Sequence, residues 1–207
     1  MDDHDLFRTG LRNLLEEQGV QVAGECENGT DALRAVRELA PDVVVMDLNM
    51  PGISGVEATR QISMIAPLTR VLVLTISDQD ADVMDAILAG ACGYLLKDSS
   101  IDELMAGIAA AAQGESLVSP AIAAKVLQRL RATSTSPREA ETIRAELSER
   151  EIQVLKLIAN GKDNAMIAAE LHISPKTVKN HISNILMKLQ IDNRIQAAVY
   201  AVRSGIV

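Results

Sequence analysis

The sequence predicts an α/β domain with a doubly wound parallel sheet, followed by a small all-α domain of four helices. Three observations predict this. The first half alternates continuous apolar runs with helical segments, a polar tract follows near position 135, and the pattern is wholly helical from Leu147 onward. The 207 residues suit two domains. We predict domains at 1–115 and 146–207, joined by a linker at 116–145 that includes a helix.

Three apolar runs in the first half are predicted to be buried parallel strands. They are Val43–Met46, Val71–Leu74 and Tyr94–Leu96. Each ends at a polar residue, namely Asp47, Thr75 and Lys97 in turn. Ligands of such sheets bind outside the carboxyl ends of the strands, so these three residues mark the expected site. A further strand-like run is predicted at Val20–Cys26, before the others.

Helices are predicted between these runs from amphipathic spacing. Their expected ranges are 6–18, 30–39, 55–65, 80–88 and 101–113, with a further helix-like stretch at 121–130 and a polar tract at 133–137. The second half begins with a capping-box pattern at Ser148 and Glu151, which opens a helix that ends near 160–161. A short helix at 164–171, a tight break, a helix from Ser174 to Leu189 and a last helix at 193–204 follow. Pro175 suits the first position of the third of these helices.

Charge and composition narrow the possible functions. The net charge is −8, but residues 1–130 hold 9 Lys and Arg against 20 Asp and Glu, whereas residues 131–207 hold 11 against 8. Any nucleic-acid contact is therefore expected in the second half. The three aromatic residues argue against a surface that stacks single-stranded bases. Isolated Cys26 and Cys92, and the lack of an apolar run long enough to cross a bilayer, predict a cytoplasmic protein without membrane contact.

A carboxylate cluster is predicted at the carboxyl edge of the sheet. Asp2 and Asp3 precede the first helix and Asp47 ends a strand, so three carboxylates would converge there and repel one another without a cation. Oxygen ligands favour Mg²⁺. A carboxylate beside Mg²⁺ can attack a phosphoryl group, while Thr75 and Lys97 would contact the other phosphoryl oxygens. Taken singly, each residue could instead be a helix cap or a solvated surface group.

These motifs together resemble a receiver domain. The matching segments are Asp2-Asp3-His4, 43–52 (VVVMDLNMPG), 71–75 (VLVLT) and 93–98 (GYLLKD). The second half resembles a LuxR-type helix-turn-helix domain over Leu147 to Leu189, so the chain resembles a NarL/FixJ-family two-component response regulator. The resemblance implies phosphorylation by a sensor histidine kinase, Mg²⁺ as cofactor, binding of double-stranded promoter DNA and a homodimer after phosphorylation.

The resemblance also implies individual roles. Asp47 would be the phosphoacceptor, and Thr75 and Tyr94 the switch pair. Lys97 would bind the phosphoryl group. Asp3 and Asp47 would bind Mg²⁺ directly, Asp2 through water and Asn49 through its backbone carbonyl. Chemistry would be limited to self-phosphorylation and self-dephosphorylation of the receiver.

Two departures from the family pattern stand out. Ile76 follows the switch threonine where receivers usually carry a small residue, so access to the phosphoryl group would be restricted. Receivers also have an apolar first strand before the acidic pair, central in a 2-1-3-4-5 order, and only Met1 remains of it here. Loss of a central strand would leave its two neighbours unpaired. Either Met1 is an internal methionine at the end of such a strand, or the receiver is truncated and depends on another chain.

The helix from Pro175 to Leu189 is the predicted DNA-binding element. Val178, Ile182 and Ile185 keep helical spacing and should face the domain core. The opposite face carries short polar and cationic side chains that suit a major groove, and a solvated helix face is the alternative. The predicted DNA-binding residues are Lys176, Thr177, Lys179, Asn180 and Ser183.

The last helix resembles the family's dimerisation helix. Its predicted dimer residues are Ala197, Ala198, Ala201 and Val202, although packing within the same domain is an equal alternative for each. Two other functions stay open. A phosphohydrolase could use Asp47 as nucleophile, but it would need an acid where Asn49 stands. A DNA-binding regulator with a degenerate receiver, controlled by protein partners, would account for the missing strand.

Overall fold

The computed structural model describes residues 1–77, 79–118, 147–191 and 193–206. The chain forms two compact units, Met1–Ser119 and Pro120–Val207. The predicted helix at 121–130 and the polar tract at 133–137 lie outside the described residues. The two-domain organisation follows the prediction, whereas the boundaries at 115 and 145 stay predictions.

The first unit is built on a parallel sheet of β1 (Val43–Met46), β2 (Arg70–Thr75), β3 (Gly93–Leu96) and β4 (Leu117–Val118). Its strand order is β1-β2-β3-β4, and Val44 lies opposite Val71 in the register. The three apolar runs are therefore strands as predicted. We did not predict β4, because two residues are too few to show any periodicity.

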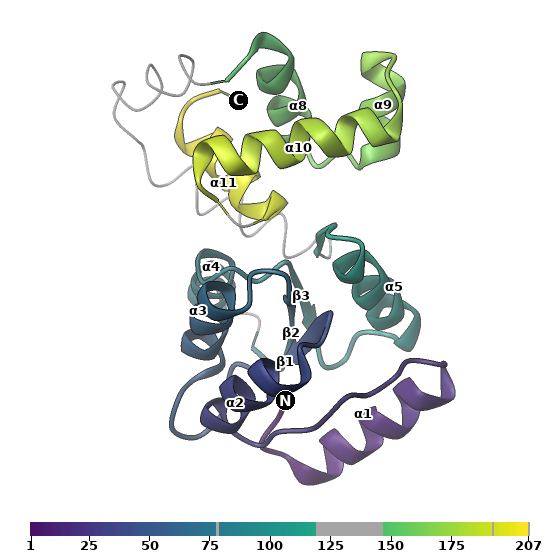
Figure 1. Ribbon diagram of the computed structural model, residues 1–207, viewed down its shortest axis with the longest axis vertical. Coiled ribbons are helices and arrows are strands. Elements are labelled where there is room, and N and C mark those ends of the chain that lie inside the picture. The colour runs from purple at the N-terminus through teal and green to yellow at the C-terminus, as the bar shows by residue number, and fades with distance from the viewer. Residues whose placement is uncertain (78, 119–146, 192, 207) are drawn as a thin grey trace. The chain divides into compact units, whose positions relative to one another are not determined.

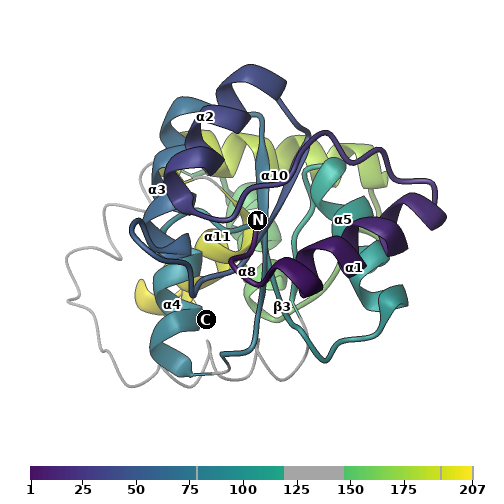
Figure 2. The same ribbon diagram turned by 90° about the horizontal axis from the view of Figure 1, so that it is seen from below.

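Helices cover both faces of this sheet, as Figures 1 and 2 show. One layer holds α1 (Asp5–Glu17) and α5 (Ile101–Ala112), and the other holds α2 (Gly29–Leu39), α3 (Gly55–Ile65) and α4 (Asp80–Leu88). Leu15 and Leu104 pack against Leu72 in the first layer. Val36 and Ile62 join the buried side chains of β1 and β2 in the second. Apolar burial on both faces explains why the strands are continuously apolar.

The prediction of a strand at Val20–Cys26 was wrong. No residue of it is assigned to a strand, although the chain there is extended between α1 and α2. The reason is that the segment has no neighbouring strand, among the described residues, with which to form backbone hydrogen bonds. The sheet begins at β1, and the residues described between positions 1 and 42 supply no strand to lie between β1 and this segment. Within the described residues, the first unit is thus a receiver-like α/β sheet without the first strand of that topology, which agrees with the predicted fold class.

The second unit contains α8 (Glu149–Ala159), α9 (Asn164–Leu171), α10 (Pro175–Leu189) and α11 (Arg194–Arg203). The capping box of Ser148 and Glu151 is present, and the side chain of Ser174 accepts a hydrogen bond from the Thr177 N–H. His172 adopts a left-handed conformation with φ of 53°, which makes the tight break between α9 and α10. Val178 and Ile185 of α10 are fully buried in the core. No helix in the described ranges combines the length and apolarity needed to cross a bilayer.

Candidate functional site

Acidic side chains gather at the carboxyl end of β1. Asp47 follows the last residue of β1 and is 2% exposed, and Asp2 is 4% exposed. Asp3 lies nearer the surface, with 31% of its side chain exposed. Asp2, Asp3, His4 and Asp47 can each offer one ligand atom within 4.8 Å of the others. The convergence of Asp2, Asp3 and Asp47 was predicted, but His4 was not, although it adjoins the acidic pair in sequence.

Gly55 holds the end of β1 against the start of α3. A Cβ atom at this glycine would lie 2.0 Å from the carbonyl oxygen of Asp47, closer than any real contact. The Gly55 N–H also donates a 3.0 Å hydrogen bond to the Leu48 carbonyl. The close approach therefore requires glycine, and it fixes the backbone that presents the Asp47 side chain.

The Lys97 ammonium forms ion pairs with two of these carboxylates. Its ammonium lies 2.7 Å from Asp2 Oδ2 and donates to Asp47 Oδ2 at 2.8 Å, with 11% of its side chain exposed. Burial alone would lower the pKa of Lys97, but the hydrogen bonds and negative charges of Asp2 and Asp47 outweigh it, so the pKa is raised. The ammonium also lies 4.6 Å from the centre of the Phe7 ring. A permanent cation therefore faces both buried carboxylates.

The remaining predicted residues of this site lie on the neighbouring strands and loops. Thr75 is fully buried at the end of β2 and accepts a 3.4 Å hydrogen bond from the Ser77 N–H. Tyr94 of β3 is fully buried, and its hydroxyl donates to the Ser77 carbonyl at 2.8 Å. Ile76 is 74% exposed. Asn49 is exposed, and its N–H lies 3.4 Å from Asp47 Oδ1.

The chemistry of this donor set suits a hard divalent cation. Asp2, Asp3 and Asp47 supply carboxylate oxygens, which Mg²⁺ prefers, and their convergence in a largely buried place favours a cation among them. A positive charge from Lys97 beside the same carboxylates can neutralise a bound anion such as a phosphoryl group. The arrangement can therefore hold a cation and an anion side by side at Asp47.

The exposed face of α10 carries the predicted DNA-binding residues. Lys176, Lys179, Asn180 and Ser183 are exposed, whereas Thr177 is half-buried with its hydroxyl 2.8 Å from that of Ser174. The Ser183 hydroxyl donates to the Lys179 carbonyl at 3.1 Å. Polar side chains thus occupy one face of a helix whose other face is anchored in the core. This is the arrangement that a recognition helix requires.

The predicted dimer residues of α11 divide into two pairs. Ala197 and Ala201 are fully buried in the core of their own domain. These two side chains pack within their own domain, which was the alternative to a dimer contact, and a dimer role for the four residues stays a prediction. Alanines three to four residues apart face one side of a helix whether that side meets α8 or a partner, so spacing could not distinguish the two. Ala198 and Val202 are half-buried and lie at the rim of the core.

Comparison with known proteins gives the family of each unit. Residues 1–109 match the response regulator receiver domain, and residues 145–201 match the bacterial regulatory proteins of the luxR family. The chain is 44% identical over 208 residues to the transcriptional regulatory protein LiaR of Bacillus subtilis (strain 168), an alignment that covers 100% of this chain and 97% of LiaR.

Two solved structures of RcsB are also similar to this chain. RcsB from Salmonella enterica serovar Typhimurium, bound to promoter rprA in the presence of phosphomimetic BeF₃⁻, is 28% identical, with a TM-score of 0.56 over 100% of this chain and 96% of that one. A structure of two RcsB dimers bound to two parallel DNAs is 28% identical, with a TM-score of 0.57 over 98% of this chain and 94% of that one. The chain belongs to the two-component response regulators of the LuxR type, in which a receiver domain controls a DNA-binding domain that regulates transcription.

Proposed function

We propose that this response regulator accepts a phosphoryl group on Asp47 and, once phosphorylated, binds promoter DNA as a dimer through α10. The observation that carries the proposal is the position of Asp47, which is buried at the end of β1 with the Lys97 ammonium 2.8 Å away. A buried carboxylate beside a cation is well placed to become an acyl phosphate whose added negative charge is neutralised locally.

Asp2, Asp3 and Asp47 would hold Mg²⁺, with Asn49 contributing its backbone carbonyl. When bound, the ion offsets the negative charge of the attacking carboxylate and of the phosphoryl group. Lys97 would move from its contacts with Asp2 and Asp47 to a phosphoryl oxygen. Thr75, at the end of the next strand, would donate its hydroxyl to another oxygen. Tyr94, on the strand beside it, would respond to that movement of Thr75 as the second member of the switch pair.

The partners follow from the same proposal. A sensor histidine kinase would supply the phosphoryl group, and the protein would act in the cytoplasm, where chromosomal DNA lies. Chemistry would be limited to phosphorylation and dephosphorylation of Asp47 itself. A phosphohydrolase acting on a separate substrate is not favoured, because Asn49 stands where such an enzyme needs a second acid.

Binding of DNA would use the exposed face of α10. Lys176, Lys179 and Asn180 lie on the first two turns, where a recognition helix meets base edges and phosphates. One similar RcsB structure is bound to promoter rprA, and the other contains two RcsB dimers bound to two parallel DNAs. Both support the proposal that this chain binds DNA as a dimer. Of the predicted dimer residues, Ala198 and Val202 are the pair near the surface of α11.

The test is phosphate incorporation from a small phosphodonor such as acetyl phosphate, with and without Mg²⁺. We expect the unaltered protein to take up close to one phosphate per chain with Mg²⁺, and Asp47→Asn to take up none. Asp42→Asn is a matched control, because Asp42 is an exposed aspartate just before β1. Full incorporation into Asp47→Asn would overturn the assignment. Phosphorylation that alters neither DNA affinity nor oligomeric state would leave a constitutive DNA-binding protein.

A further inference from the structure

The ammonium of Lys97 lies over the aromatic ring of Phe7, a residue of α1. The Lys97 Nζ is 4.6 Å from the centre of that ring. At this distance the electron-rich face of an aromatic ring attracts a cation. The other partners of the same ammonium are the carboxylates of Asp2 and Asp47. Phe7 therefore adds an uncharged partner to two charged ones.

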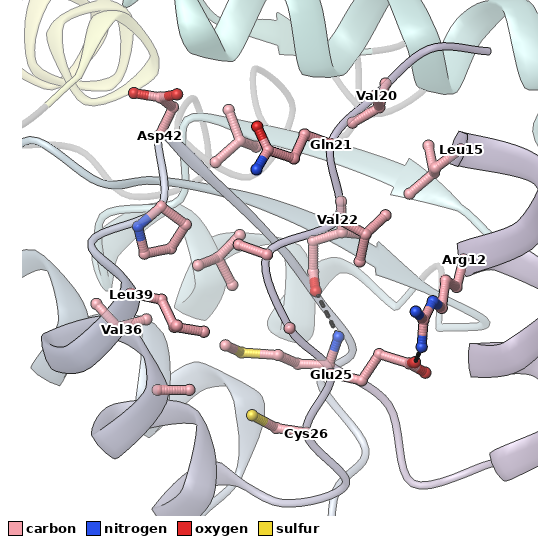
Figure 3. Close-up of a pocket in the computed structure, with 18 of the residues that line it drawn as sticks. Arg12, Leu15, Val20, Gln21, Val22, Glu25, Cys26, Val36, Leu39 and Asp42 are labelled. Atoms are coloured by element: carbon pink, nitrogen blue, oxygen red, sulfur yellow. Dashed lines mark hydrogen bonds and ion pairs between the residues drawn. The ribbon is translucent and has the colours of Figure 1, made fainter. Parts of the chain in front are cut away.

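Packing fixes the position of the Phe7 ring. Phe7 is half-buried and, together with Leu11 and Leu15, belongs to the side of α1 that packs on the core of the sheet. These three residues are spaced four apart, so they follow one face of the helix. Figure 3 shows Leu15 of this face pointing from α1 into the cavity that it lines. The ring is thus part of a rigid apolar layer that reaches the carboxyl edge of the sheet.

Polar contacts fix α1 itself beside the acidic site. The Arg8 guanidinium donates to the Asp2 carbonyl at 2.7 Å, which ties the residue after Phe7 to the acidic pair. One turn further along, Arg12 forms an ion pair with Glu25 of the extended segment, 2.8 Å away (Figure 3). The helix that carries Phe7 is therefore held at both of these points, and the ring stays close to Lys97.

The two carboxylates are the contacts that Lys97 would give up when the site is loaded. Asp2 and Asp47 are proposed to bind Mg²⁺, so the ammonium would lose both of them. A lysine side chain is a flexible four-carbon stem with a strongly hydrated end, and without another partner it would turn to solvent. A hard cation takes oxygen ligands, so it does not compete for an aromatic ring. The contact with Phe7 can therefore persist when both carboxylates are occupied.

We propose that Phe7 is a positioning residue for phosphoryl transfer, whose ring holds the Lys97 ammonium beside Asp47 while the carboxylates bind the divalent cation. The proposal rests on the proposed function. In transfer from acetyl phosphate, a carboxylate oxygen of Asp47 attacks phosphorus, the bond from phosphorus to the acetate oxygen breaks, and acetate leaves with that bonding pair. No proton is transferred, so Lys97 keeps its charge and donates a hydrogen bond to a phosphoryl oxygen. An ammonium that is already in place does not have to be ordered during the transfer.

Fluorination of the ring separates this role from packing. An aliphatic or a fluorinated side chain at position 7 would still pack against Leu11 and Leu15. Only an electron-rich ring face attracts the ammonium, however, and each ring fluorine withdraws electrons from that face. The attraction should therefore fall with the number of fluorines, while the apolar contacts of Phe7 are kept.

The experiment uses the fact that Phe7 is the single phenylalanine of the chain. Fluorinated phenylalanine supplied during expression therefore changes this residue alone. The rate constant for phosphorylation of Asp47 by acetyl phosphate is measured at saturating Mg²⁺ for rings with no, one, two and three fluorines. We expect it to fall at each step, by roughly threefold to tenfold for three fluorines, and Phe7→Leu to be slowed at least as much.

Leu11→Ala is the matched control for packing. It removes an apolar side chain one turn along the same face of α1, so it should lower the melting temperature. Because Leu11 does not contribute a ring to Lys97, the rate constant of this variant should stay within about twofold of that of the unaltered protein.

Fluorine NMR follows the contact without any phosphate. A single ring fluorine at Phe7 gives one signal, and Lys97→Met, which removes the charge above the ring, should shift it. We expect this difference between the two proteins to persist at saturating Mg²⁺. If Mg²⁺ abolishes the difference, the ammonium has left the ring and the proposal is overturned.

The kinetic outcomes distinguish this proposal from the proposed function. Equal rate constants throughout the fluorine series, with Asp47 still phosphorylated, would overturn the role of Phe7 and leave the proposed function intact. A slowing that follows the loss of melting temperature, in Leu11→Ala as in the fluorinated proteins, would make Phe7 a packing residue only. An unaltered protein that takes up no phosphate on Asp47 would overturn the proposed function and this proposal with it.

Discussion

The Lys97 ammonium lies 2.8 Å from Asp47 Oδ2 and holds the residue that we propose as phosphoacceptor in an ion pair. The same ammonium lies 2.7 Å from Asp2 Oδ2. Asp2 and Asp47 are almost fully buried, so their mutual repulsion is not screened by water. Lys97 therefore supplies the positive charge that a bound divalent cation would otherwise supply to these carboxylates. We expect Lys97 and such a cation to compete for them.

We expect Lys97→Met to destabilise the metal-free receiver by about 3 kcal/mol, because two buried carboxylates lose their counter-charge. Added Mg²⁺ should recover much of this loss, and it should stabilise the variant more than the unaltered protein, in which Lys97 already pairs with the acids. Urea unfolding in the presence of Mg²⁺ or of a chelator measures both effects. Lys156→Met, at an exposed site on α8, is the control. Equal stabilisation of both proteins by Mg²⁺ would contradict the competition.

Gly55 provides a second test of the same site. We expect Gly55→Ala to lower the free energy of unfolding by at least about 2 kcal/mol, because the added Cβ would overlap the Asp47 carbonyl and force the backbone apart. Phosphate incorporation should slow as well, since that backbone presents Asp47. Gly10→Ala on α1 is the matched control. A Cβ there meets no atom within 4 Å, so the substitution should stabilise by about 0.5–1 kcal/mol. Equal effects at the two glycines would contradict the role of Gly55.

Sequence patterns predicted most of the receiver because its signals are local. The strand ends at Asp47, Thr75 and Lys97 are visible in the chain as apolar runs stopped by a polar residue. The contact of Lys97 with Asp2 was not predictable in the same way, because nothing in the spacing says which carboxylate a long side chain reaches. The segment Val20–Cys26 has the composition of a strand, yet a strand also needs a neighbour, and composition does not report on neighbours.

In the second unit, too, local features were predicted and long-range contacts were not. The capping box of Ser148 with Glu151 was predicted, since its two members are three residues apart. The Lys188 ammonium, 37 residues further along, also donates to Glu151 Oε2 at 2.8 Å, and this was not predicted. Burial of Ala197 and Ala201 likewise depends on where α8 lies. Local sequence patterns predicted where the helices lie. The packing of the helices against one another determines which face of each helix is buried in the core.

Stability of the DNA-binding domain should depend on pH through Glu151. Burial alone would raise the pKa of this carboxyl, but hydrogen bonds from Lys188 and Ser148 outweigh it and hold the pKa below its ordinary value of 4.5. A lowered folded-state pKa stabilises the domain above about pH 4.5, and this contribution is lost as the pH falls below that value. We expect Glu151→Gln to cost about 1–2 kcal/mol at pH 7 and less at pH 3. Urea unfolding across this range measures the difference, and a cost independent of pH would refute the assignment.

The dimer should depend on the rim of α11 and not on its buried alanines. We expect Ala198→Glu to weaken the phosphorylated dimer at least roughly tenfold, because it adds a charge to the proposed interface. The melting temperature should change little, because a half-buried position lets the added charge turn to solvent. Ala201→Leu should instead lower the melting temperature, because Ala201 is fully buried and the larger side chain overpacks the core. Sedimentation velocity and thermal unfolding separate the two effects. A dimer unaffected by Ala198→Glu would place the interface elsewhere.

The separate roles of base contacts and phosphate contacts on α10 can be tested by comparing Asn180 with Lys176. Loss of a side chain that reads a base should relax sequence preference, whereas loss of a phosphate contact should weaken binding to all sequences alike. We expect Asn180→Ala to cost about 1–3 kcal/mol at its base pair and Lys176→Ala to reduce the salt slope of binding by about one unit. Arg37→Ala, which removes an exposed cation from α2 of the receiver, should change neither quantity. Titrations of phosphorylated protein against matched and mismatched duplexes at several salt concentrations measure both. If Asn180→Ala weakens all duplexes equally, its side chain contacts the backbone, and another residue of α10 reads the sequence.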